Sequence, residues 1–110
     1  MTTAHISASF DSGNIRVNRA EGDVFDLEIA LDHQSDFYQW FHFRLTGAAG
    51  RSVTLRITNA GNSAYPGGWP DYAARVSEDR RAWRCAETAY ADGVLTIRHT
   101  PATYNAWFAY

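Results

Sequence analysis

Four histidines and one cysteine are the most reactive side chains of this 110-residue sequence. None of the histidines, His5, His33, His42 and His99, stands at metal-ligand spacing from a second histidine, a cysteine or a glutamate. We therefore expect hydrogen-bonded structural roles for them and no metal ligand within the sequence.

Two arrangements could still support hydrolytic chemistry. Asp32 and Asp36 bracket His33, which would suit a general acid or base, although such residues also cap loops. Cys85 could be a nucleophile beside a base, but a lone cysteine on a strand is more often a small buried hydrophobe. We favour the structural interpretation of both and name no catalytic residue; a small hydrolase remains an alternative.

Aromatic side chains are the most unusual feature of the composition. They make up 15% of the residues, including four tryptophans, which is more than one small core comfortably holds. The surplus could form a platform that binds sugar or peptide. It could instead cover a face that packs on another domain, where Trp and Tyr are enriched.

The stretch 36–46 is predicted to be the central strand that organises these groups. Phe41, Phe43 and Leu45 fall on one side of such a strand and should build the core. Tyr38 and Trp40 fall on the other side with His42, facing a second sheet or a neighbouring domain.

The rest of the chain alternates in the same way. Apolar residues recur at every second position in 25–31 and 53–57, and Asp92-Gly93 is a strong hairpin signal. Segment 72–76 is predicted to be a strand, and 59–71 a structured loop because it is rich in Pro and Gly. The fold class is all-β: an antiparallel β-sandwich of about seven to nine short strands, forming a single domain over residues 1–110.

Charge and composition limit the partners. The net charge of −2 gives no basic footprint for nucleic acid, and no apolar run approaches the ~18 residues of a membrane span. A single cysteine suits a reducing compartment, and no secretory signal is visible at the start of the sequence. We expect a cytoplasmic protein that binds neither nucleic acid nor membrane.

Four motifs carry a resemblance to a known family. They are Phe10-Asp-Ser-Gly-Asn14, the stretch 36–47, the loop 59–69 and Trp107-Phe-Ala-Tyr110. In register, they resemble the N-terminal domain of cytosolic-type zinc metallocarboxypeptidases. Those enzymes trim glutamates from tubulin in eukaryotes and have many bacterial relatives.

The resemblance implies an accessory role for this sequence. It implies a β-sandwich that packs on the C-terminal peptidase domain of the same polypeptide and helps to fold it or shape its active-site cleft. The parent would be a zinc-dependent enzyme that removes C-terminal, acidic residues from peptides or proteins. The family's zinc-binding His-x-x-Glu motif has no match here, so zinc is expected in the catalytic domain, which lies outside this sequence.

The same resemblance points to aromatic residues as interdomain contacts. The candidates are Trp40, Tyr65, Pro66, Trp69, Trp107 and Tyr110. The alternative is a stand-alone β-sandwich that binds carbohydrate or peptide through surface aromatics.

Overall fold

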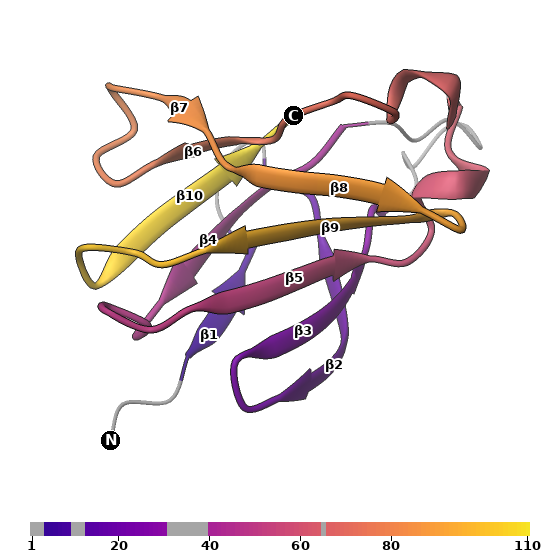
Figure 1. Cartoon of the computed structure of the whole chain (residues 1–110). Helices are drawn as coiled ribbons and strands as arrows, with labels where there is room; N and C mark the ends of the chain where they lie inside the picture. The colour runs from indigo at the N-terminus through magenta and orange to yellow at the C-terminus, as the bar shows by residue number, and fades with distance from the viewer. Residues whose placement is uncertain (1–3, 10–12, 31–39, 65) are drawn as a thin grey trace.

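Two stacked β-sheets make up the domain (Figure 1). The computed structural model describes residues 4–9, 13–30, 40–64 and 66–110, which form ten strands. One sheet, called the β4 sheet, contains in spatial order β1 (His5–Ser7), β4 (His42–Thr46), β10 (Asn105–Ala109), β6 (Arg75–Ser77) and β7 (Arg84–Cys85). The other, the β5 sheet, contains β2 (Arg16–Glu21), β3 (Val24–Glu28), β5 (Val53–Ile57), β9 (Val94–His99) and β8 (Glu87–Ala91).

Side-chain alternation places the core between the two sheets. Phe43 and Leu45 of β4 and Leu55 of β5 all belong to this buried core. Phe43 also stacks on Phe108 of β10, with ring centroids 5.3 Å apart. The predicted β-sandwich is therefore confirmed, although the described residues form ten strands and not the expected seven to nine.

The strand predicted over 36–46 begins only at His42 in the described residues, and it lies between β1 and β10, so β10 and not β4 is the central strand of the sheet. The predicted division of its two sides holds wherever the structure describes it. Phe41, Phe43 and Leu45 are buried in the core as expected, whereas Trp40 is exposed. Tyr38 lies outside the described residues.

Tight turns join neighbouring strands where the sequence predicts them. The β8–β9 hairpin turns at Asp92 and Gly93, whose φ angles are 55° and 80°. A two-residue turn with positive φ at both positions matches the right-handed twist of the flanking strands, which explains the Asp-Gly pair. Gly22 serves the β2–β3 turn, with a φ of 61°.

Two features of the topology differ from the prediction. β3 pairs with β5 in parallel, so the sandwich is not wholly antiparallel. The strand expected over 72–76 begins only at Arg75, and the preceding residues belong to the loop that contains the short 3-10 turns η1 (Ala60–Asn62) and η2 (Pro66–Gly68). The chain crosses between the sheets at Ala86, since β7 lies in one and β8 in the other.

Candidate functional site

The outer face of the β5 sheet is covered with paired charges. Its arginines each meet a carboxylate, in the pairs Arg16–Glu28, Arg19–Glu21, Arg56–Asp26 and Arg98–Glu87. The pKa of Glu28 is lowered, chiefly by its hydrogen bond from Arg16. Such exposed pairs contribute about 0–1 kcal/mol each, so this face is a solvated, charge-balanced surface.

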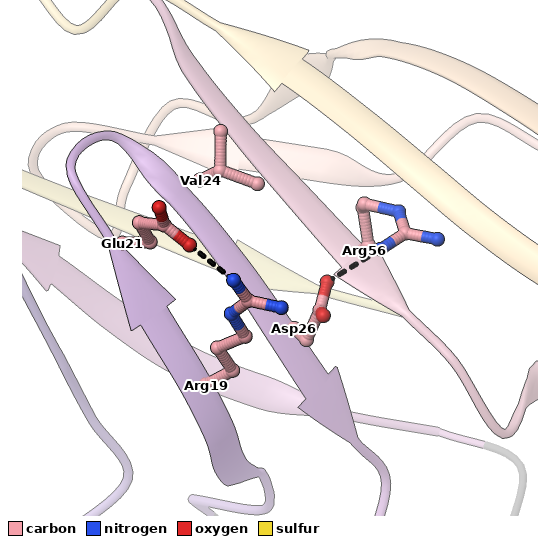
Figure 2. A pocket seen from close by; sticks show the side chains of 5 residues that line it. All are labelled: Arg19, Glu21, Val24, Asp26 and Arg56. Carbon is pink, nitrogen blue, oxygen red and sulfur yellow. Dashed lines mark hydrogen bonds and ion pairs between the residues drawn. The ribbon is translucent and has the colours of Figure 1, made fainter.

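An open depression on this face is the pocket in Figure 2. It is lined by Arg19, Glu21, Val24, Asp26 and Arg56. The dashed lines join Arg19 to Glu21 and Arg56 to Asp26. Because each charge already has a partner, the depression offers no unmet charge to a ligand. We therefore do not treat it as the functional site.

The outer face of the β4 sheet has a different composition. The strand register places Trp107 beside Arg44 and Ala109 beside His42. No carboxylate is present among the outward side chains that the structure describes on this sheet, which are His5, Ser7, His42, Arg44, Thr46, Arg75, Ser77, Cys85, Asn105, Trp107 and Ala109. The strands of this surface therefore carry arginine, histidine and tryptophan, while a carboxylate, Asp79, reaches the surface from the β6–β7 tip through its hydrogen bond with Ser77.

The β6–β7 tip folds onto this surface. The Arg80 guanidinium lies 5.8 Å from the centre of the Trp107 ring, within cation–π range. The Trp83 ring meets His42 edge-on, with centroids 6.2 Å apart. We call the residues Trp40, His42, Arg44, Arg75, Trp83 and Trp107 the cationic aromatic face.

Asp79 fixes the shape of that tip. Its carboxylate accepts hydrogen bonds from the backbone N–H groups of Arg81 and Ala82, at 2.8 and 3.0 Å, and from the hydroxyl of Ser77. These donors, Ala82 first, lower the pKa of Asp79. The tip is thus held by local hydrogen bonds while its arginine and tryptophan lie over the sheet.

A second aromatic group surrounds the end of the described chain. Tyr110 stacks on Tyr72 with ring centroids 5.2 Å apart, and it meets Trp69 and Phe41 edge-on. Its backbone N–H donates to the carbonyl of Phe41 at 3.1 Å. Burial raises the pKa of Tyr72, whose hydroxyl has no hydrogen-bond partner among the described residues.

Trp69 does not occupy the position expected of an interdomain contact. Its side chain is 0% exposed, and its indole N–H donates to the Ala60 carbonyl at 2.9 Å and to the Ser63 hydroxyl at 2.8 Å. The expectation that Trp69 faces another domain is therefore wrong. The ring fills the end of this domain's own sandwich and anchors the loop around η1 and η2.

The other contact candidates differ in their exposure. Trp40 and Tyr110 are about half exposed, at 49% and 47%, and Pro66 is exposed in η2. Trp107 is partly buried on the outward side of β10. Tyr65 lies outside the described residues. The interdomain role of Trp40, Pro66, Trp107 and Tyr110 stays a prediction.

The groups considered for chemistry are dispersed. His5, His42 and His99 belong to different strands, and no three His, Cys, Asp or Glu side chains of the described residues could together hold a metal ion. His33 and Asp36 lie outside the described residues. Cys85 was expected to be buried, which is wrong: it is exposed on edge strand β7, where the Arg75 guanidinium donates to its sulfur.

Two asparagines important for the local structure were missed from the sequence. The Asn14 side chain accepts from the Ala30 N–H and donates to the Trp40 carbonyl, so it links Ala30 to Trp40. Asn59 exchanges two hydrogen bonds with the backbone of Ile29, each 3.0 Å long. Asn14 ends the first sequence motif quoted above and Asn59 begins the loop motif, and this position in the motifs was the signal that could have identified them.

Comparison with known families identifies a match over nearly the whole chain. Residues 6–110 match the family described as the cytosolic carboxypeptidase N-terminal domain. An uncharacterized protein of Zymomonas mobilis is 56% identical over 108 residues, which are 98% of this chain and 28% of that protein. No helix in the described part of the chain is long and apolar enough to cross a bilayer.

Solved structures give the same result. A metallo-carboxypeptidase from Burkholderia cenocepacia is 38% identical, with a TM-score of 0.94, and the match covers 97% of this chain. A metallo-carboxypeptidase from Pseudomonas aeruginosa, solved in complex with (2-guanidinoethylmercapto)succinic acid, is 36% identical, with a TM-score of 0.91 over 96% of this chain. The chain spans only 28% of the length of either relative.

Proposed function

Because the chain belongs to the cytosolic carboxypeptidase N-terminal domain family, we propose that it is a non-catalytic accessory domain packed on a peptidase domain of the same polypeptide. The observation that carries this proposal is the partial coverage of its relatives. A TM-score of 0.94 over only 28% of a metallo-carboxypeptidase means that the match is one part of a larger enzyme. The accessory domain would help to fold the peptidase domain or shape the rim of its cleft.

The parent protein would be a cytoplasmic zinc metallocarboxypeptidase that removes C-terminal, acidic residues from peptides or proteins. The names of the relatives support the metallo-carboxypeptidase class, and the motif resemblance supports the acidic substrate and the zinc. No group of three His, Cys, Asp or Glu side chains among the described residues could hold a metal ion, and the motif resemblance assigns the zinc to the catalytic domain. The contribution of this domain would be mechanical support of the enzyme.

Cleaving the full-length protein between its domains tests the accessory role. A specific protease site is inserted after Tyr110, the protein is cut, and the two fragments are separated by size-exclusion chromatography. Packed domains should co-elute after cleavage, and the peptidase fragment should lose heat resistance once the N-terminal fragment is removed. Fragments that separate at micromolar concentration, with a peptidase fragment of unchanged stability, would contradict the proposal.

A further inference from the structure

We propose that the peptidase domain docks on the cationic aromatic face and that its matching surface is acidic. This inference rests on the proposed function, because it names the surface through which the accessory domain would act. Trp83 and Arg75 are the two side chains that we place at the centre of the contact. Trp83 is 39% exposed although it is large and apolar, and Arg75 is exposed on the same side of the sheet.

The course of the chain favours a domain of the same polypeptide as the partner that covers this face. β10 is the central strand of the β4 sheet, and Tyr110 follows it directly. The end of the chain, marked C in Figure 1, lies at the tip of β10 beside β6 and β7. A segment continuing from Tyr110 would leave from the end of the middle strand of this sheet, and the relatives have most of their length outside the match.

Charge decides the chemistry of the matching surface. Among the described strand residues of the β4 sheet, Arg44 and Arg75 have no outward carboxylate beside them, and the Asp79 carboxylate of the tip is already taken up by Ser77 and two backbone N–H groups. A cation that is covered by another protein surface needs an acceptor, or its desolvation opposes binding. The Nε of Arg44 is already buried without an acceptor among the described residues. Acidic side chains on the peptidase domain would supply these acceptors.

The opposite face is a poorer docking surface for the same reason. Covering the β5 sheet would desolvate pairs such as Arg56–Asp26 and Arg98–Glu87, which gain nothing from a partner because they are already neutralised. Tryptophan and arginine, in contrast, are the residues that most often dominate the energy of an interface. The cationic aromatic face supplies both.

Matched substitutions in the cleaved full-length protein test the face. Trp83→Ser and Arg75→Gln should each weaken the association of the two fragments by about tenfold or more, as expected when a central contact is lost. Two controls remove similar side chains elsewhere. Tyr104 lies just before the start of β10, at the end of this strand opposite Tyr110, and Arg98 lies on the β5 sheet. Tyr104→Ser and Arg98→Gln should each change the dissociation constant by less than about twofold.

Salt and Cys85 provide readouts that need no substitution. Raising NaCl from 0.1 to 1 M shortens the Debye length from about 10 to about 3 Å, so the fragments should bind more weakly. Cys85 is exposed beside Arg75, and its alkylation by iodoacetamide, followed by mass spectrometry, should be slower in the full-length protein than in the released domain.

The outcomes separate the two proposals. If the unmodified fragments fall apart, the proposed function fails, and the docking face fails with it. The docking face is wrong, while the accessory role stands, if the fragments stay together and Cys85 reacts equally fast in the full-length protein and in the released domain. The same holds if the control substitutions weaken binding as much as Trp83→Ser. The melting temperature of each released domain shows whether a substitution has merely unfolded it.

Discussion

Trp69 joins the loop of 3-10 turns to the end of the sandwich through two hydrogen bonds from one N–H. Trp69→Phe keeps an aromatic ring but leaves the Ala60 carbonyl and the Ser63 hydroxyl without this donor in a buried site. Loss of a buried partner costs about 1–3 kcal/mol, so the free energy of unfolding should fall by that amount. Urea denaturation followed by far-UV circular dichroism measures it.

An exposed tryptophan is the matched control for Trp69. Trp83→Phe should change the free energy of unfolding of the released domain by less than about 0.5 kcal/mol, since the Trp83 side chain is partly in water. Equal losses from Trp69→Phe and Trp83→Phe would show that the indole hydrogen bonds of Trp69 are not the stabilising contact.

His99 should make the stability of the domain depend on pH. Its ring packs edge-on against Phe108, with centroids 5.8 Å apart, and its Nε2 is buried without a partner among the described residues. Burial first, and then the charge of Arg84, lower the pKa of His99 below the ordinary 6.5, whereas Glu78 opposes this shift. The folded state therefore disfavours the protonated ring.

The sign of this dependence follows from proton uptake. Below pH 6.5 the unfolded chain binds the His99 proton more readily than the folded chain, so stability should fall as the pH drops from 7.5 to 5. Melting temperatures across this range should decline less steeply in His99→Gln, while His5→Gln, at the exposed start of β1, should follow the unmodified domain. An unchanged slope in His99→Gln would contradict the assignment.

At the scale of elements, η1 and the β8–β9 hairpin touch through two glycines. The Gly61 N–H donates to the Gly93 carbonyl at 2.8 Å, and a Cβ added at Gly61 would lie 2.7 Å from the Gly93 Cα. Gly61→Ala must therefore separate two backbones, which should cost about 1–3 kcal/mol in the free energy of unfolding.

A second glycine of the same loop provides the control. A Cβ at Gly67, in η2, would meet nothing within 4 Å, so Gly67→Ala should change the free energy of unfolding by less than about 0.5 kcal/mol. Chemical denaturation of both variants in parallel makes the comparison. A Gly61→Ala domain as stable as Gly67→Ala would mean that the hairpin turn can move away without loss.

Strands and turns could be predicted where a local pattern specifies them. Val53 to Ile57 alternates strictly, and Asp92-Gly93 specifies its hairpin through the φ angles that the turn requires. The parallel pairing of β3 with β5 could not be predicted from the sequence. Alternation shows which face of a strand is buried, but it does not show which strand pairs with it or in which direction.

The candidate site was harder to predict than the fold. Periodicity separates Trp40 from the core side of 36–46, but it gives no direction to Trp69 in an irregular loop rich in Pro and Gly. Similarly, the exposure of Cys85 depends on β7 being an edge strand, which is a property of the assembled sheet. Residues in regular strands were therefore placed better than those whose surroundings depend on distant segments.

At the scale of the whole molecule, the two outer faces of the sandwich differ in composition. One balances its charges in ion pairs, whereas the other has arginine and exposed tryptophan, with a carboxylate only from Asp79 of the β6–β7 tip among its described residues. Such an asymmetry would suit the proposed accessory role, in which one side of the domain contacts the peptidase domain. The core between the sheets is independent of either face, so the domain should fold without its partner.

This independence leads to a prediction for the 110-residue chain on its own. Its Cα radius of gyration is 13.1 Å, which agrees with the roughly 13 Å expected of a compact domain of this length. Small-angle X-ray scattering of the released domain should give a value near this one, slightly increased by hydration, and about 33 Å in concentrated guanidinium chloride. An expanded chain in dilute buffer would show that the sandwich requires the peptidase domain in order to fold, because the contacts between the two sheets would then be too weak to offset the conformational entropy of the chain.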